Sequence, residues 1–371
     1  MTDEPRDPRA GLGDARRVVV KIGSKSIARG EQPGQGRFAV VAKAIAEMRA
    51  RDRNVALVSS GAIALGFVRL GMSVRPETTP LLQASAAAGQ SLLMRAYEAA
   101  FAEHGLHVAQ ILLTHADLAD RERYLNARAA LDALFDLGAV PIINENDTVS
   151  VEEIKLGDND QLAAMVATLI GADLLVLLTD VEGLLDTAGA RVSVVKDADA
   201  VAGLARAGKS ELGSGGMASK ISAARSATRH GVPVVVADAR DPNVLASVLA
   251  GADVGTLFLP YGARIASRKH WIAFTLKPKG ALLVDAGAVR AVKEAGKSLL
   301  PAGVLGVRGE FEPGEAVSIV GPDGREVARG LARYGTRDVA RLAGARTTDI
   351  EQRLGHHGGD EVVHRDDMVV L

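Results

Sequence analysis

Two clusters of carboxylate and amide side chains lie near the middle of this 371-residue chain. Asn144–Asp147 (Asn-Glu-Asn-Asp) follows the apolar segment 139–143, and Gly157–Asp160 (Gly-Asp-Asn-Asp) leads into the apolar segment 161–172. Asn and Asp are also common in turns and helix caps, so either cluster alone is explained without a ligand. Together, on the two flanks of one loop, they indicate a polar site between a strand's C-terminal end and a helix's N-terminal end. Open parallel sheets bind ligands at such places.

Two lysines stand in sequence contexts that suit an anion. Lys21 ends an apolar strand just before Gly23-Ser24, and Lys220 closes the Gly-rich run Gly213–Lys220 at the start of a helix. Backbone N–H groups of such a run can wrap a phosphate, although a solvated lysine and a surface loop are equally ordinary readings of each feature alone. Ser59–Ala62 and Thr179-Asp180 end two further strands. We therefore expect a polyanion site in which carboxylates hold the cations in place.

Several other chemistries are not supported by the sequence. Gly203–Ser210 matches the P-loop expression, but a helical, polar segment precedes it where that loop requires a strand. The chain has no Cys, which removes disulfides, thiolate metal sites and Cys nucleophiles. Its eight His residues show no metal-binding spacing with carboxylates, and no Ser/His/Asp arrangement can be recovered. We expect no protein-held metal.

The elements that must position these residues alternate along the chain. Continuous apolar strands between helices predict an α/β fold, with a mainly parallel central sheet sandwiched by helices. The expected strands cover 17–22, 54–60, 107–113, 139–143, 174–180 and 232–237, and the expected helices cover 39–51, 81–103, 121–137, 161–172 and 221–230.

A change of texture after residue 262 predicts a second, small β-rich domain, with short strands and a hairpin turn at Gly321–Gly324. The expected organisation is a disordered extension (1–15), a main domain (16–262), a linker (263–280), the β-rich domain (281–359) and a C-terminal tail (360–371).

Composition is that of a globular protein, with 47% hydrophobic and 24% charged residues. Only 3% of residues are aromatic and the net charge is −1, which disfavours a nucleic-acid platform and gives no field toward anionic membranes. The N-terminus lacks the apolar core of a signal peptide, and Asp173 interrupts the longest apolar run, 162–178. We expect no transmembrane segment and a cytoplasmic protein.

These motifs together resemble the amino acid kinase family, in particular members that phosphorylate the side-chain carboxylate of L-glutamate for proline biosynthesis. The segments that carry the resemblance are Val19–Ser24, Ser59–Ala62, Asp120–Arg128, Ile143–Asp147, Gly157–Asp160, Leu177–Asp180 and Gly213–Lys220. Ser24 and Ser214 stand where the family often has Thr, which keeps the hydroxyl. From about Ala281 the chain resembles a PUA module, through Ser298–Gly303, Gly314-Glu315 and Arg325–Tyr334.

The resemblance implies a reaction of ATP with L-glutamate that gives γ-glutamyl phosphate and ADP. An ionised carboxylate needs no general base, so the site must supply positioning and charge neutralisation. Mg²⁺ would sit mainly on ATP phosphates and water. The implied catalytic residues are Lys21, Asp160 and Lys220, the substrate-binding residues are Ser60, Asp147 and Asn159, and the ATP-binding residues are Lys21, Thr179, Asp180, Ser214, Gly215, Gly216, Met217, Ala218, Ser219 and Lys220.

Asp147 would pair with the substrate's α-ammonium, which disfavours N-acetylglutamate as the acceptor. Aspartate and uridylate kinases share the sheet but lack this pairing of motifs. An RNA-binding protein acting through the PUA-like domain is the alternative from another class. Residues 281–359 hold eleven Lys/Arg against ten Asp/Glu, and RNA affinity needs a basic excess on one face. We therefore expect no nucleic-acid partner.

The resemblance also implies partners other than ATP and glutamate. Enzymes of this kind are typically homo-oligomers that proline inhibits, and hand-off of the product to glutamate-5-semialdehyde dehydrogenase is a further expectation.

Overall fold

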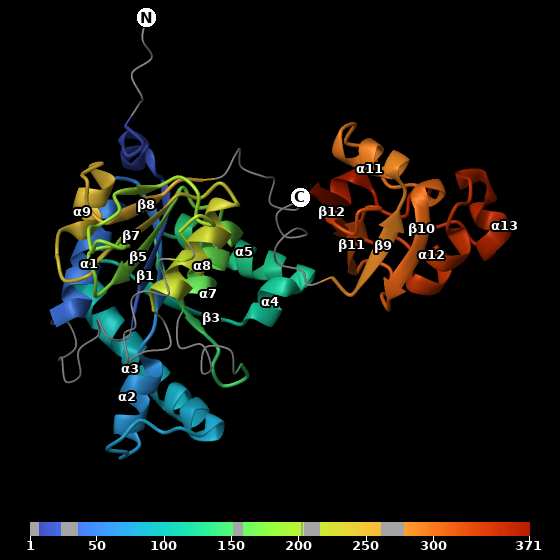
Figure 1. The fold of residues 1–371 in the computed structure, drawn as a ribbon. Coiled ribbons are helices and arrows are strands. Elements are labelled where there is room, and N and C mark those ends of the chain that lie inside the picture. The colour runs from blue at the N-terminus through green and yellow to red at the C-terminus, as the bar shows by residue number, and fades with distance from the viewer. Residues whose placement is uncertain (1–6, 24–35, 151–158, 202, 204–215, 261–277) are drawn as a thin grey trace, which may run out of the picture. The chain divides into compact units, whose positions relative to one another are not determined.

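The computed structural model describes residues 7–23, 36–150, 159–201, 203, 216–260 and 278–371. The chain forms two compact units, residues 1–264 and 265–371 (Figure 1). The expected linker, 263–280, lies almost wholly outside the described residues. Within those residues, no helix is long and apolar enough to cross a membrane.

An eight-stranded sheet organises the described part of the first unit, as the alternation of strands and helices predicts. Its strand order is β3-β4-β2-β1-β5-β7-β8-β6, and every neighbouring pair is parallel except β7 and β8. The strands are β1 Arg17–Ile22, β2 Asn54–Ser59, β3 Val108–Leu113, β4 Val140–Glu145, β5 Leu174–Thr179, β6 Val194–Val195, β7 Val234–Asp238 and β8 Thr256–Phe258.

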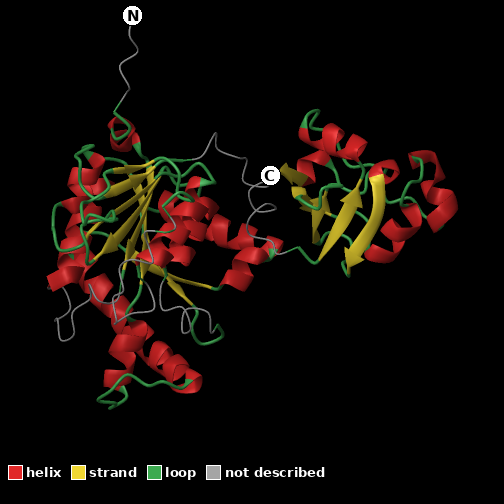
Figure 2. Ribbon diagram, viewed as in Figure 1, coloured by secondary structure: helices red, strands yellow, loops and turns green. Residues whose placement is uncertain are grey.

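Helices cover both faces of this sheet (Figures 1 and 2). One face carries α1 (Gly36–Arg49), α3 (Thr79–Ala102) and α9 (Val244–Leu249). The other carries α5 (Arg121–Asp136), α7 (Asp160–Leu169) and α8 (Met217–Thr228). Shorter helices α2 (Ala62–Arg69) and α4 (His115–Ala119) follow β2 and β3. The predicted α/β class is confirmed.

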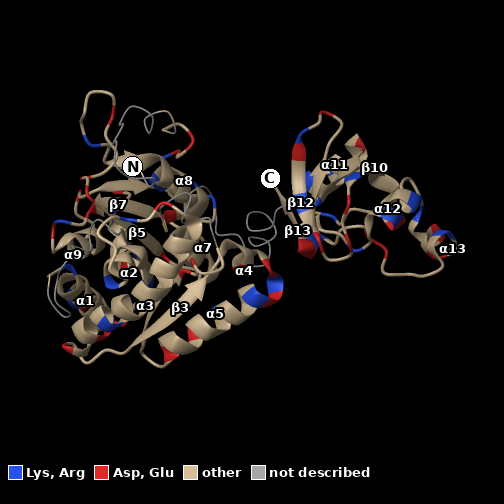
Figure 3. Cartoon of the chain, turned by 90° about the horizontal axis from the view of Figure 1, so that it is seen from below, with Lys and Arg blue, Asp and Glu red and all other residues tan. Residues whose placement is uncertain are grey.

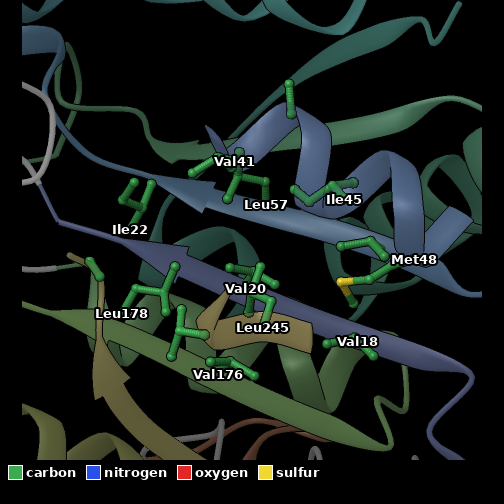
Figure 4. Close-up of a cluster of buried hydrophobic side chains, with 14 of the residues drawn as sticks. Val18, Val20, Ile22, Val41, Ile45, Met48, Leu57, Val176, Leu178 and Leu245 are labelled. Carbon is green, nitrogen blue, oxygen red and sulfur yellow. The ribbon is translucent and has the colours of Figure 1, made fainter. Parts of the chain in front are cut away.

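Side-chain alternation along β1 connects this architecture to the site. Val18, Val20 and Ile22 point into the hydrophobic core with residues of α1 and α9, as Figure 4 shows. Because successive strand residues face opposite sides of a sheet, Lys21 faces the side covered by α7 and α8. Burial of one face of β1 in the hydrophobic core therefore directs Lys21 toward the opposite face.

Residues 7–15 differ from the sequence-based expectation of disorder over residues 1–15, of which residues 1–6 lie outside the described residues. Ala10–Asp14 form a 3-10 helix, and Leu12 and Ala15 join the main core. Arg9 is buried and donates hydrogen bonds to the backbone oxygens of Ser193, Val254 and Gly255. Arg9 holds this segment through hydrogen bonds to backbone oxygens. Such bonds leave no hydrophobic pattern in the sequence, so the composition of the segment predicts disorder instead.

The second unit is built on a five-stranded sheet of order β10-β9-β11-β12-β13, in which β9 and β11 are parallel and the other pairs antiparallel. The predicted hairpin at Gly321–Gly324 joins β11 and β12. The strands are β9 Gly280–Val284, β10 Val304–Gly309, β11 Ala316–Val320, β12 Glu326–Leu331 and β13 Met368–Val370, and the helices are α11 Ala286–Lys293, α12 Thr336–Leu342 and α13 Ile350–Leu354.

Residues 360–371 are not a tail outside this unit. Val362, Val363 and Met368 are buried in its core, and β13 pairs with β12 as an edge strand. The apolar residues near the C-terminus therefore complete the second sheet, and the expected domain end at residue 359 is too early.

Candidate active site

Four neighbouring parallel strands bring the predicted residues to one edge of the sheet. β4, β2, β1 and β5 are adjacent in that order, so their C-terminal ends lie side by side. Asn144 is near the end of β4, Ser60 follows β2, Lys21 is the penultimate residue of β1, and Thr179 ends β5. The convergence expected from sequence is a consequence of this strand order.

A buried carboxylate joins the two lysines. Asp160 Oδ1 lies 2.6 Å from Lys21 Nζ, and its Oδ2 lies 3.1 Å from Lys220 Nζ. The exposed fractions are 0% for Asp160, 2% for Lys21 and 6% for Lys220. Asp160 begins α7 and Lys220 lies in the first turn of α8. Each lysine approaches a different carboxylate oxygen, so one carboxylate orients two ammonium groups.

The charge of this trio favours an anion. Two ammonium groups flank one carboxylate in a site that water barely reaches. The dipole of α7 further stabilises Asp160 in its first turn. A phosphate group placed beside the two lysines could accept charge-assisted hydrogen bonds from them.

Asn159 links three strand ends through its side-chain amide. Asn159 Nδ2 donates to the Ser59 backbone oxygen at 2.9 Å, to Ser60 Oγ at 3.2 Å and to Asn144 Oδ1 at 2.6 Å. Its Oδ1 is buried and accepts no hydrogen bond from the part of the chain that the structure describes. The predicted pair Ser60 and Asn159 is therefore in contact, and the amide presents an acceptor that a ligand donor can use.

The segment after β4 supplies buried acidic side chains. Asp147 is buried two residues beyond the strand, and Glu145 accepts a hydrogen bond from Ser150 Oγ at 2.7 Å. His115 Nδ1 lies 3.7 Å from Glu145 Oε2. Glu145 thus stabilises the segment that carries Asp147, beside Asn144 and Asn159.

Only some of the residues predicted to bind ATP are among the described residues. Thr179 ends β5 next to β1, Thr179 Oγ1 lies 3.3 Å from Asp180 Oδ1, and the Asp180 side chain is exposed. Gly216 is the N-cap of α8, and Met217, Ala218, Ser219 and Lys220 form its first turn. Ser214 and Gly215, also predicted to bind ATP, lie outside the described residues, as do Ser24, Gly157 and Asp158.

The strand order separates the predicted substrate groups along the edge. Asn144 lies in β4 and Asp147 just after it, Ser60 follows β2, Lys21 lies in β1 and Thr179 ends β5. Neighbouring strands are about 4.8 Å apart, so β4 and β5 are separated by roughly 14 Å. That span suits two ligands meeting near Lys21, one on each side of β1.

Two residues that contribute to this arrangement have no role in the sequence-based prediction. Asn144 Oδ1 accepts from Asn159 Nδ2 and from the backbone N–H of Glu145, the latter at 2.9 Å. Tyr97 on α3 contacts Ser59 through its hydroxyl. Asn144 stands within a recognised motif and could have been found, whereas Tyr97 looks like any core aromatic on an apolar helix.

Comparison with known proteins decides the family. The model of the amino acid kinase family matches residues 16–238, and that of the PUA domain matches residues 280–354. The chain belongs to the amino acid kinase family. It carries a PUA domain in its second unit.

Relatives of this family member align over nearly the whole chain. A glutamate 5-kinase of Pelobacter propionicus is 48% identical over 368 residues, which cover 96% of this chain and 98% of that protein. A glutamate 5-kinase of Thermus thermophilus is 48% identical over 369 residues, covering 98% and 99%. Among solved structures, N-acetylglutamate synthase from Neisseria gonorrhoeae with coenzyme A and L-arginine matches with a TM-score of 0.50 at 15% identity, covering 76% of this chain and 68% of that one. This likeness concerns the fold alone.

Proposed function

We propose that this family member transfers the γ-phosphoryl group of ATP to the side-chain carboxylate of L-glutamate, the first step of proline biosynthesis. The observation that carries the proposal is the buried Lys21–Asp160–Lys220 trio at the edge of the sheet. Its two ammonium groups, oriented by one carboxylate, suit phosphoryl transfer, and relatives aligned along nearly the whole chain are glutamate 5-kinases.

The reaction needs positioning more than acid–base catalysis. A glutamate carboxylate oxygen attacks the γ-phosphorus, an O–P bond forms, and the bond from phosphorus to the β–γ bridging oxygen breaks. The products are γ-glutamyl phosphate and ADP, and no proton has to be removed from the ionised nucleophile. Lys21 and Lys220 would neutralise charge on the transferring group, with Asp160 holding both ammonium groups in orientation.

The amino acid would occupy the β4–β2 side of Lys21. Asp147 would pair with its α-ammonium, and the free acceptor oxygen of Asn159 suits the same donor. Ser60 would complete the pocket. ATP would occupy the β5 side, against Thr179, Asp180 and the N-terminal turn of α8 from Gly216 to Lys220, together with Ser214 and Gly215.

Mg²⁺ would enter with the nucleotide in this proposal. Phosphate oxygens and water would bind it, a common mode for Mg²⁺. The ion would supply further neutralisation of phosphate charge.

The alternatives receive less support. N-acetylglutamate lacks the ammonium that Asp147 would bind. RNA binding requires a basic face. Figure 3 instead shows acidic and basic residues interspersed along the second unit. Tight, salt-sensitive retention of tRNA in a filter-binding assay would favour that alternative.

The direct test is ADP release in a coupled assay with L-glutamate, N-acetylglutamate, L-aspartate and UMP as acceptors. We expect turnover with L-glutamate and little with the other three. Equal or greater turnover with any other acceptor would contradict the proposed substrate.

Oligomer formation, inhibition by proline, hand-off to glutamate-5-semialdehyde dehydrogenase and a cytoplasmic location belong to the same proposal. Val68, Leu70, Val74 and Leu81, on or beside α2 and α3, are exposed apolar side chains that suit contact with a second copy. Light scattering of the wild type and of Val74→Asp tests the oligomer, and rates at increasing proline concentration test inhibition. A monomeric wild type, or a rate indifferent to proline, would remove that part of the proposal.

A further inference from the structure

We propose that Tyr97 on α3 is a positioning residue for the amino-acid pocket, acting through Ser59 on the turn that carries Ser60. The inference rests on the proposed function, because it assigns Tyr97 to the glutamate side of the site. Tyr97 touches neither ligand in this proposal, so it acts only by holding other groups in place.

A pair of hydrogen bonds connects Tyr97 to the turn. The Tyr97 hydroxyl lies 2.7 Å from Ser59 Oγ, and Ser59 Oγ donates to the Ser60 backbone oxygen at 3.1 Å. Ser59 Oγ is therefore within hydrogen-bond distance of both the Tyr97 hydroxyl and the Ser60 backbone oxygen. The contacts run from Tyr97 through Ser59 to Ser60, and all three residues are buried.

The turn after β2 depends on such contacts because it is short and conformationally unusual. Ser59 ends β2, Gly61 has φ +112° and α2 begins at Ala62. Only two residues separate the strand from the helix, and glycine permits the positive φ at low cost. Asn159 holds this turn through the Ser59 oxygen and Ser60 Oγ, and Tyr97 holds it through the Ser59 side chain.

The ring of Tyr97 is itself fixed, which fixes its hydroxyl. Tyr97 is 1% exposed and lies edge-on to Phe38 with ring centroids 4.9 Å apart at 80°. Phe101 lies on the same helix at 6.3 Å. Burial raises the pKa of the Tyr97 phenol above its usual value, so the group stays protonated and uncharged at neutral pH. Phenylalanine can retain the ring packing and remove only the hydrogen bond.

Loss of the hydroxyl should act on one substrate more than the other. Ser59 would keep a buried hydroxyl without its Tyr97 partner, and the orientation of Ser60 relative to Asn159 would be less restricted. β2 lies on the β4 side of β1, whereas the nucleotide residues Thr179 and Lys220 lie elsewhere on β5 and α8. A role in packing alone would lower stability without this substrate selectivity.

The test compares Tyr97→Phe with the wild-type full chain in steady-state kinetics. We expect the KM for L-glutamate to rise by about threefold to tenfold, the size of one net hydrogen bond. The KM for ATP should stay within about twofold. Tyr334→Phe is the matched control: it removes a buried tyrosine hydroxyl that bonds Gly358 and Gly359 in the second unit, and both KM values should be unchanged.

Ser59→Ala and the double variant complete the test. Because both residues act through one relay, the effects on the KM for glutamate should be clearly less than additive. A fall in melting temperature with an unchanged KM for glutamate, or fully additive effects, would overturn the inference. A wild type that does not phosphorylate L-glutamate counts against the proposed function, while an active wild type with an indifferent Tyr97→Phe counts against Tyr97 alone.

Discussion

At the scale of single residues, Asp160 links the two lysines of the proposed site. Its two oxygens contact lysines from β1 and α8, so its removal leaves two ammonium groups in a site with almost no access to water. Breaking a buried charge pair in this way costs about 3–5 kcal/mol. Asp160→Ala should therefore reduce both turnover and stability. Substitution of a lysine separates the effect on catalysis from the effect on stability more clearly.

Lys220→Met should lower kcat by at least about a hundredfold, because the proposed mechanism uses the charge of Lys220 on the transferring phosphoryl group and the substitution removes that charge while keeping the length of the side chain. Lys43→Met is the matched control, since Lys43 is an exposed lysine on α1 whose ion pair with Glu47 is long, at 3.9 Å. Steady-state rates with saturating ATP and glutamate measure the effect. A Lys220→Met enzyme with near wild-type kcat would exclude Lys220 from catalysis.

Asp147 and Asp180 allow a crossed experiment on the two sides of the site. Asp147→Asn should raise the KM for L-glutamate by about tenfold or more, since an ammonium–carboxylate interaction is lost. Asp180→Asn should instead raise the KM for ATP. The two KM values of each variant, measured in the same assay, decide the assignment. If Asp147→Asn leaves the KM for glutamate unchanged, the ammonium assignment is wrong.

His230 gives the fold a sensitivity to acid. Burial lowers its pKa from 6.5 to about 4, so the unfolded chain binds a proton more readily than the folded one between these values. The stability that depends on neutral His230 is complete above pH 6.5 and is lost as the pH falls toward 4. At pH 5 the loss should be about 2 kcal/mol.

Urea unfolding of the wild type and His230→Asn at pH 7 and pH 5 measures this loss. The variant should show a smaller decrease between the two pH values, although its stability at pH 7 is lower. Parallel decreases for both proteins would assign the acid sensitivity to other groups.

At the scale of elements, α2 and α3 pack with their backbones in contact. A Cβ on Gly66 would meet the Ser85 backbone oxygen at 1.7 Å, and one on Gly89 would meet the Ala62 backbone oxygen at 1.8 Å. No rotation of a side chain relieves contacts with backbone atoms. The two glycines therefore fix the distance between the helix that follows the Ser59–Gly61 turn and the helix that carries Tyr97.

Gly66→Ala should destabilise the protein by about 1–3 kcal/mol through overpacking, despite the better helix propensity of alanine. Gly306→Ala in β10 is the matched control, because a Cβ added to Gly306 would meet nothing within 4 Å. Thermal unfolding monitored by circular dichroism compares the two. An unchanged or raised melting temperature for Gly66→Ala would show that the helices can separate at little cost.

At the scale of the whole molecule, the described site residues all belong to the first unit. That unit has its own core, and the second unit has another, built from β9 to β13 and their helices. Domains with independent cores commonly fold alone. The PUA domain supplies none of the contacts described for the trio or the amide network.

A fragment of residues 1–264 should accordingly phosphorylate L-glutamate with a kcat within about threefold of the full chain. Coupled ADP release measures the rate, and circular dichroism verifies that the fragment is folded. A folded fragment without turnover would assign the PUA domain a necessary part in catalysis.

Much of this molecule follows from its sequence, for identifiable reasons. Long apolar strands between helices predict the parallel sheet. The carboxyl ends of its strands predict where Lys21 and Ser60 lie, and the start of the following helix predicts where Asn159 lies. Chain-end segments were less predictable, since Arg9 and β13 depend on partners far away in the chain. β6 and β8 are too short to show a hydrophobic period in the sequence. The hydrogen bond between Tyr97 and Ser59 depends on the angle between a helix and a strand, which the sequence does not show.

Asp160 and Lys220 are 60 residues apart in the chain, and Lys21 is more distant still. Large loops must close before these three side chains meet, and closing them is the slow part of acquiring a native topology. Local helices form without them. During renaturation from denaturant, helical signal should return ahead of enzymatic competence, so the interval between the two recoveries reports when these distant charges come together.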